Sequence, residues 1–217
     1  MIRAVAFDMD GVIFDTERYA VSAWVEVGKA WGFPLTWEVA LGVVGLDASQ
    51  AALKMKAALG QDFDFWKARE LRTQMMRKHF NEEGMPIRPG VREALQFLKE
   101  EGYPVCLASS TVAEVVDWYF ERCDLAPYFQ VRITGDMVEK RKPNPAIYQL
   151  ACKAMKLPPQ EVAAVEDSNA GILAAHYAGC RPIMVPDLTP PSAEVEPLLW
   201  AKLSSLTELA DKLKEER

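Results

Sequence analysis

From about residue 85 onward, short apolar runs alternate with stretches of helical period. The runs have the length of buried strands, and the intervening stretches repeat apolar residues every three or four positions. The expected strands are 104–108, 131–134, 162–165 and 182–185, and the expected helices are 91–101, 111–122, 145–155 and 170–178. A capping box of Ser205 and Glu208 is expected to open a last helix. This alternation predicts an α/β fold with a doubly wound parallel sheet.

One more strand is expected near the amino terminus, and it ends in two carboxylates. Residues 3–7 are followed by Asp8, Asp10 and Gly11. In an open α/β sheet, ligands bind beyond the carboxyl ends of the strands, and paired aspartates there need a cation or a shared proton. One carboxylate can attack an electrophile while its neighbour transfers protons. The alternative is that both aspartates only form a turn, with Gly11 supplying a permissive backbone angle.

The segment between the first strand and the alternating part is expected to be helical. About residues 17–80 show helical periodicity and no convincing strand. We therefore expect a Rossmann-like catalytic core of residues 1–15 and 85–217, interrupted by an all-helical cap domain of residues 16–84. A cap joined to its core by two linkers is suited to opening and closing over a site.

Composition excludes several classes of function. The net charge of −6 gives no electrostatic case for binding nucleic acid or an anionic membrane. No apolar run approaches the ~20 residues of a membrane span, and no signal peptide is recognisable. The four cysteines are scattered and form neither a disulfide framework nor a metal-binding CxxC pattern: Cys106, Cys123, Cys152 and Cys180. We expect a cytoplasmic protein, and nothing in the sequence requires more than a monomer.

Three further polar groups follow expected strands of the core. Ser109 precedes a helix, where its hydroxyl and the first amides could hold an anion; Lys142 lies near another helix start. Glu166 and Asp167 end an apolar strand. Each has a simpler interpretation: Ser109 as a helix N-cap, Lys142 as a solvated surface lysine, and the two acids as helix-start residues favoured by the helix dipole.

The joint occurrence of these groups favours a functional site. Carboxylates, one lysine and one hydroxyl at the same edge of a sheet make a Mg²⁺ site beside a phosphate site. The segments 8–12, 109, 142–143 and 166–171 resemble the four motifs of the haloacid dehalogenase-like superfamily. With the helical insert after the first motif, the whole chain resembles the subfamily of β-phosphoglucomutase-like proteins and small sugar-phosphate phosphatases.

The resemblance implies a role for each residue. Asp8 would attack phosphorus in line and become an aspartyl phosphate, and Asp10 would protonate the leaving oxygen and then activate water. Ser109 and Lys142 would hold the phosphoryl oxygens. The implied Mg²⁺ ligands are Asp8, the backbone carbonyl of Asp10, Asp167 and Glu166, the last directly or through water. Phosphoryl transfer depends mainly on positioning and charge neutralisation, which agrees with these roles.

The expected function is a Mg²⁺-dependent phosphatase that acts on a small phosphorylated metabolite, most simply a sugar phosphate. Dehalogenation is disfavoured because it needs neither a metal nor a proton donor for the leaving group. A hexose-phosphate mutase is the first alternative, and a non-catalytic phosphate-binding module is the second.

The cap bears on the choice between phosphatase and mutase. The β-phosphoglucomutases carry a histidine and an arginine at cap positions that match Ala20 and Ala48 here. Neither alanine can time a general acid or hold a second phosphate. Arg69, Arg72 or Arg77 could replace the missing arginine, but a solvated helix face is the simpler interpretation of these residues, so a hydrolase is favoured. Glu17, Gly45 and Asp47 are expected to approach the substrate from the linker and the cap loop.

Overall fold

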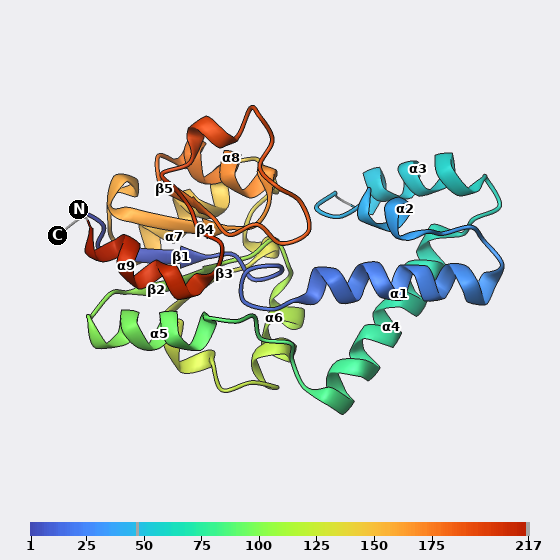
Figure 1. The fold of residues 1–217 in the computed structure, drawn as a ribbon, viewed down its shortest axis with the longest axis horizontal. Helices are drawn as coiled ribbons and strands as arrows, with labels where there is room; N and C mark the ends of the chain where they lie inside the picture. Colours follow the sequence, from blue (N-terminus) through green and yellow to red (C-terminus); the bar gives the residue numbers. More distant parts are fainter. Residues whose placement is uncertain (47, 216–217) are drawn as a thin grey trace. The chain divides into compact units, whose positions relative to one another are not determined.

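The computed structural model describes residues 1–46 and 48–215. They form two compact units: the first comprises Met1–Phe14 and the chain from Ile87 onward, and the second is Asp15–Pro86 (Figure 1). Among the described residues, no helix combines the length and the apolar character needed to cross a membrane.

A six-stranded, all-parallel sheet forms the centre of the first unit, with strand order β3-β2-β1-β4-β5-β6. The strands are β1 (Ala4–Phe7), β2 (Val105–Ala108), β3 (Val131–Ile133), β4 (Val162–Glu166), β5 (Arg181–Met184) and β6 (Ala201–Lys202). Every residue of β1, β2 and β4 is buried. Their near-continuous apolar sequences follow from this burial, because helices cover both faces of a parallel sheet.

The strand register brings the ends of three strands to one level. Phe7 of β1 pairs with Leu107 of β2 and with Val165 of β4. The residue that follows β1 is Asp8, and the same register places it opposite Ala108 and Glu166, the last residues of β2 and β4. The sheet itself therefore places polar residues from β1 and β4 side by side at its carboxyl edge.

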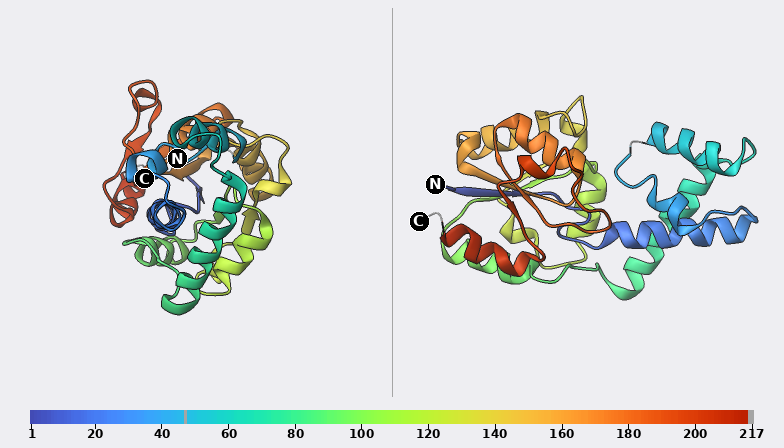
Figure 2. Two further views of the ribbon diagram at one scale, coloured as in Figure 1. Left: turned by 90° about the vertical axis from the view of Figure 1, so that its right-hand side faces the viewer. Right: turned by 45° about the horizontal axis from the view of Figure 1, so that its top comes forward.

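Helices pack on both faces of this sheet. The helices of the first unit are α5 (Val91–Glu100), α6 (Ala113–Phe120), α7 (Ala146–Met155), α8 (Asn169–Ala178) and α9 (Leu209–Lys214). Helices α7 and α8 lie on one face, and α5 and α9 lie on the opposite face (Figures 1 and 2). Small side chains such as Ala4 and Ala6 join α7 and α8 in one buried cluster. The predicted doubly wound fold is confirmed.

The second unit contains only helices among its described residues (Figure 2). They are α1 (Thr16–Trp31), α2 (Trp37–Leu41), α3 (Ala48–Leu59) and α4 (Phe65–Glu83). The side chains of Thr36 and Asp64 cap α2 and α4 by accepting backbone N–H groups. Trp24 of α1 stacks on Phe65 of α4, which closes the apolar interior of the unit. The predicted helical insert is therefore present.

Two details near the carboxyl terminus differ from expectation. Strand β6 was not predicted, because its two residues are too short to show a period. The predicted capping box is wrong in its pairing. Ser205 Oγ accepts the Thr207 N–H at 3.3 Å, whereas the Glu208 carboxylate accepts hydrogen bonds from Ser204. A short 3₁₀ turn precedes α9 at this point. The hydrogen-bond partner of Glu208 is therefore Ser204 and not the expected Ser205.

Candidate active site

The turn after β1 positions Asp8 at the carboxyl edge of the sheet. The Asp8 N–H donates to Val165 O of β4 at 2.9 Å, which extends the strand pairing by one residue. Gly11 has φ +79°, and a Cβ atom there would overlap the Asp167 carboxylate. Glycine is therefore required both by the backbone angle and by the close approach of Asp167. The Asp8 residue is 8% exposed, so it is more than a solvated turn former.

Lys142 connects the ends of three strands through its ammonium group. Its Nζ donates to Asp8 Oδ1 at 2.5 Å, to Glu166 Oε1 at 2.6 Å and to the Ala108 carbonyl at 2.9 Å. The side chain is only 7% exposed. The alternative of a solvated surface lysine is therefore wrong. All three ammonium protons have acceptors, so the position of Nζ is fixed between the two carboxylates.

Among the described residues, the ion pairs of Lys142 join one ammonium group to two carboxyl groups. Burial raises the pKa of the Asp8 carboxyl to about 8, although the Lys142 ammonium acts in the opposite direction. Burial also lowers the pKa of Lys142, but the charges of Asp8 and Glu166 outweigh it and raise that pKa above its ordinary value. One ammonium thus faces two carboxylates, and a bound cation would compensate the remaining negative charge.

Glu166 is held from several sides by protein groups. The fully buried Tyr148 donates its hydroxyl to Glu166 Oε1 at 2.6 Å, and Ser168 Oγ lies 3.4 Å from Oε2. Burial and the negative charge of Glu166 both raise the pKa of Tyr148, so its phenol keeps its proton and remains a donor. A Cβ atom at Gly171 would overlap the Glu166 carboxylate. The small first turn of α8 therefore makes room for this acid.

Ser109 and Asp10 are connected through Thr111. The Ser109 hydroxyl oxygen accepts the Thr111 N–H at 3.1 Å, and the Thr111 hydroxyl donates to Asp10 Oδ2 at 2.8 Å. Because the Ser109 oxygen is already an acceptor, its own proton is directed toward a further acceptor such as a phosphoryl oxygen. The end of β2 and the turn after β1 thus present one hydroxyl and one carboxylate together.

The alternative of Ser109 as a helix N-cap is also wrong. Helix α6 begins at Ala113, four residues further along, and the N–H of Ala113 donates to Asp136 Oδ1 at 3.0 Å. The cap of α6 therefore comes from the loop after β3. Ser109 is only 1% exposed, although no helix end requires its hydroxyl.

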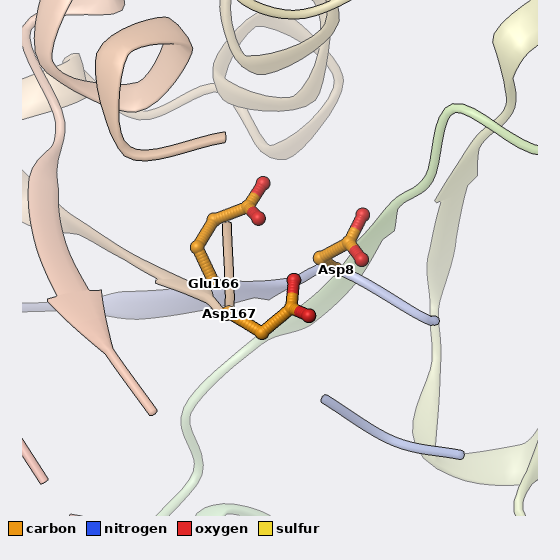
Figure 3. A group of neighbouring side chains, drawn as sticks. All are labelled: Asp8, Glu166 and Asp167. Carbon is orange, nitrogen blue, oxygen red and sulfur yellow. The ribbon is translucent and has the colours of Figure 1, made fainter. Parts of the chain in front are cut away.

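Three carboxylates form a group that fits a divalent cation. Asp8, Glu166 and Asp167 each offer an oxygen, and these oxygens all lie within 4.8 Å of one another. Figure 3 shows the three side chains as close neighbours. An all-oxygen set of carboxylates is the donor set that Mg²⁺ prefers. Asp10 is expected to contribute its backbone carbonyl, and its carboxylate is not a member of this group.

The residues expected to approach the substrate from the insert belong to the second unit. Glu17 lies in the first turn of α1 and is partly buried. Gly45 is exposed and has φ +74°, as expected for a loop glycine. Asp47 lies outside the described residues. Ala20, which was compared with the mutase histidine, is 7% exposed.

Two residues of the site were not identified from the sequence. Thr111 looks like an ordinary loop residue, although its position two residues after Ser109 was the available signal. Tyr148 follows Lys142 by six residues and has the spacing of an apolar helix face, so it is indistinguishable from a core aromatic. Both act through hydroxyl groups whose partners are distant in the sequence: Thr111 donates to Asp10, and Tyr148 donates to Glu166.

The comparison with protein families identifies the class of this chain. The family described as haloacid dehalogenase-like hydrolase matches residues 2–179. This match spans most of the chain. The protein therefore belongs to the haloacid dehalogenase-like hydrolases and is an enzyme.

Individual relatives agree with this assignment. The phosphorylated carbohydrates phosphatase of Thermotoga maritima is 34% identical over 182 residues, which cover 84% of each chain. Hexitol phosphatase B of Escherichia coli is 30% identical, and the match covers 97% of this chain and 96% of the relative. A solved structure from T. maritima, of a protein proposed to be a β-phosphoglucomutase, has a TM-score of 0.81 and 31% identity over 99% of both chains. The predicted family resemblance is confirmed.

Proposed function

We propose that this hydrolase is a Mg²⁺-dependent phosphatase that releases inorganic phosphate from a small phosphorylated carbohydrate. The observation that carries the proposal is the buried Lys142 ammonium between Asp8 and Glu166, with the Ser109 hydroxyl at the end of the neighbouring strand. This arrangement offers a nucleophile, a cation and a hydrogen-bond donor to one phosphoryl group. The phosphatases among its relatives, which are named for phosphorylated carbohydrates and hexitols, support the substrate class.

The first step transfers the phosphoryl group to the protein. An Asp8 oxygen forms a bond to phosphorus while the bond between phosphorus and the sugar oxygen breaks. The electron pair of the broken bond stays on the sugar oxygen, which takes a proton from the Asp10 carboxyl. The products are the free sugar alcohol, a phosphorylated Asp8 and an ionised Asp10.

The second step restores both aspartates. A water molecule gives one proton to Asp10 and attacks phosphorus, and the bond between phosphorus and the Asp8 oxygen breaks. Inorganic phosphate leaves, with Asp8 ionised and Asp10 protonated as at the start. The same two residues therefore serve both steps with reversed proton transfer, as microscopic reversibility favours.

The remaining groups hold the phosphoryl oxygens and the cation. Ser109 donates its hydroxyl proton to one oxygen, and Lys142 neutralises charge beside Asp8. Asp8, the Asp10 carbonyl and Asp167 would hold Mg²⁺, which when bound supplies positive charge for the phosphoryl oxygens. Lys142 and Tyr148 each donate a hydrogen bond of 2.6 Å to Glu166 Oε1. We therefore assign Glu166 to orienting Lys142 and to contact with the metal through a water molecule.

The mutase alternative finds no support in the insert. Ala20 and Ala48 occupy the positions compared with a general-acid helper and a phosphate-binding arginine, and an alanine side chain can neither donate a hydrogen bond nor carry a charge. We further place the enzyme in the cytoplasm, because its four cysteines are free thiols. We propose a monomer, because one chain supplies all the core groups named above.

The test is release of inorganic phosphate from a panel of phosphorylated carbohydrates, with Mg²⁺ and with a chelator. The panel includes hexitol phosphates and β-glucose 1-phosphate, and formation of glucose 6-phosphate is followed in parallel. We expect Mg²⁺-dependent phosphate release from one compound or a few. Glucose 6-phosphate without phosphate release would establish a mutase, and binding of phosphate esters without turnover would establish a non-catalytic module.

A further inference from the structure

We propose that Thr111 is a positioning residue that sets which oxygen of Asp10 carries the proton to the leaving group. The inference rests on the proposed phosphatase function and adds a residue to its proton transfer. It starts from one contact: the Thr111 hydroxyl donates to Asp10 Oδ2 at 2.8 Å.

This contact gives the two Asp10 oxygens different tasks. Oδ2 accepts a hydrogen bond from Thr111, so the transferable proton is favoured on Oδ1. The same hydrogen bond restricts rotation of the Asp10 carboxyl group about its Cβ–Cγ bond. Since general acid catalysis requires the donor oxygen within hydrogen-bond reach of the leaving oxygen, a fixed carboxyl plane favours the reaction.

Thr111 can serve as a fixed reference because its backbone is held at both ends. Its N–H donates to Ser109 Oγ at 3.1 Å, and its carbonyl accepts the Gly135 N–H at 2.8 Å. Gly135 packs so closely on Ser110 that a Cβ atom would overlap the Ser110 carbonyl. The loop after β2 is thus clamped against the loop after β3. A movement of Asp10 away from Thr111 would break the hydrogen bond, because the loop is not free to follow.

The arrangement also ties proton donation to phosphate binding. Ser109, which would hold a phosphoryl oxygen, accepts the N–H of the residue whose hydroxyl orients Asp10. One short segment, residues 109–111, therefore fixes the proton donor relative to the phosphoryl group. A single missing hydroxyl should disturb proton transfer without removing the nucleophile, the lysine or the carboxylates.

The expected effect depends on the leaving group. A sugar alkoxide is a poor leaving group and needs the proton of Asp10, whereas p-nitrophenolate leaves readily without one. Thr111→Val should therefore slow hydrolysis of the carbohydrate phosphate by about 10- to 100-fold and that of p-nitrophenyl phosphate by less than about 3-fold. Thr111→Ser keeps the hydroxyl and should keep the wild-type ratio of the two rates.

The matched control is Thr134→Val. The Thr134 hydroxyl donates to Asp136 Oδ1 at 2.6 Å, so this variant also loses a bond from threonine to aspartate, but at a carboxylate that caps α6. Both rates are measured for each variant at saturating Mg²⁺, and a melting curve verifies folding. We expect the ratio of rates to be unchanged in Thr134→Val. If Thr111→Val does not fold, Thr111→Ala is compared with Thr111→Ser in its place.

The outcomes separate the inference from the proposed function. A wild-type protein that hydrolyses neither ester would contradict the phosphatase function itself. A wild-type protein that hydrolyses both, with a Thr111→Val variant that slows both equally, would overturn the role of Thr111. An equal ratio in Thr111→Ser and Thr111→Val would also overturn it.

Discussion

Lys142 is the residue on which the charge balance of the site depends. Its single positive charge lies between Asp8 and Glu166, and all three side chains are nearly inaccessible to solvent. A buried ion pair is stable only when its charges and hydrogen bonds are matched. Here two carboxyl groups face one ammonium group. Without metal, folded Asp8 therefore retains a proton at a pH at which the unfolded chain would release it, and this lowers the free energy of unfolding.

This imbalance predicts that Asp8→Asn is more stable than the wild type in the presence of a chelator. The folded-state pKa of Asp8 is about 8, above the ordinary value of 3.8, so ionisation favours the unfolded chain. Below about pH 4, Asp8 is protonated in both states and adds no penalty. Between pH 4 and 8, the wild type loses stability relative to the variant. We expect the free energy of unfolding of Asp8→Asn to exceed that of the wild type by about 1–3 kcal/mol at neutral pH, measured by urea unfolding.

A pH series provides the control for this prediction. The difference in the free energy of unfolding between variant and wild type should shrink as the pH falls from 8 toward 4. The reason is that Asp8 becomes protonated in the unfolded chain as well, whereas Asn is neutral throughout. A difference that is independent of pH, or a variant less stable than the wild type at neutral pH, would contradict the charge balance described for Asp8 and Lys142.

Tyr148 supports Glu166, and its loss should be measurable. Tyr148→Phe removes a buried hydroxyl and leaves Glu166 with one donor fewer. We expect a loss of about 1–3 kcal/mol in the free energy of unfolding, because the buried Glu166 carboxylate loses a hydrogen bond. We also expect a slower phosphatase reaction, because Glu166 is then less firmly held and orients Lys142 less well. Urea unfolding and steady-state kinetics measure the two effects.

The control is Tyr128→Phe, which removes a hydroxyl that donates to Gln96 at an exposed position. It should change the free energy of unfolding by less than about 0.5 kcal/mol. If both tyrosine variants behave alike, the Glu166 contact has no special importance.

Three residues of the candidate site could be placed together from the sequence, because each one follows a strand. Asp8, Ser109 and Glu166 lie at the ends of β1, β2 and β4, and parallel strands bring their carboxyl ends to one edge. Thr111 and Tyr148 could not be predicted in the same way. Their roles depend on side-chain directions and on partners in other loops, and neither leaves a periodic signal in the sequence.

Helix α8 illustrates how an element is fitted to the site. Gly171 lies in its first turn, where its N–H donates to Ser168 Oγ at 3.0 Å. In a helix interior, alanine is more favourable than glycine by about 1 kcal/mol. At this position the added Cβ would overlap the Glu166 carboxylate, which Lys142 and Tyr148 hold in place. The steric term should therefore outweigh the helix propensity.

We predict that Gly171→Ala lowers the free energy of unfolding by about 1–3 kcal/mol and reduces phosphatase activity. In Gly42→Ala, the control, the new Cβ would lie 3.3 Å from the Glu38 carbonyl oxygen and 3.3 Å from the flexible end of Lys54. These contacts are relieved by a shift of a few tenths of an ångström, whereas the contact at Gly171 is an overlap. Gly42→Ala should stay within about 0.5 kcal/mol of the wild type. Thermal or urea unfolding distinguishes them, and a stable, active Gly171→Ala would contradict the packing described here.

The elements themselves were predictable where a period was long enough to detect. Helices such as α1 and α5 have apolar faces several turns long, and β1 and β4 are continuous apolar runs. Strand β6 has two residues, and its place beside β5 depends on the path of the preceding loop. The pairing at Ser204 and Ser205 depends on a 3₁₀ turn, which the sequence pattern does not distinguish from a regular helix start.

Metal binding should be visible in the stability of the whole protein. A ligand at 100 times its dissociation constant stabilises the folded state by about 2.7 kcal/mol, which is roughly 5–10 °C in melting temperature for a protein of this size. We expect Mg²⁺ to raise the melting temperature of the wild type to this extent. Asp167→Asn should lose most of the increase, because one carboxylate of the cation group is missing.

The control for the metal effect is Asp117→Asn, a variant at an exposed aspartate outside the carboxylate group. It should keep the full increase in melting temperature with Mg²⁺. An increase in Asp167→Asn equal to that of the wild type, or no increase in the wild type, would contradict the assignment of the metal site.

The nucleophilic role of Asp8 can be examined by trapping the phosphorylated protein. Wild-type protein is mixed with a carbohydrate phosphate radiolabelled at phosphorus, quenched in acid during turnover, digested and mapped. We predict label on the peptide that contains Asp8, and neither label nor appreciable phosphate release with Asp8→Asn. Label on another residue, or an Asp8→Asn variant that still releases phosphate at a comparable rate, would contradict the proposed mechanism.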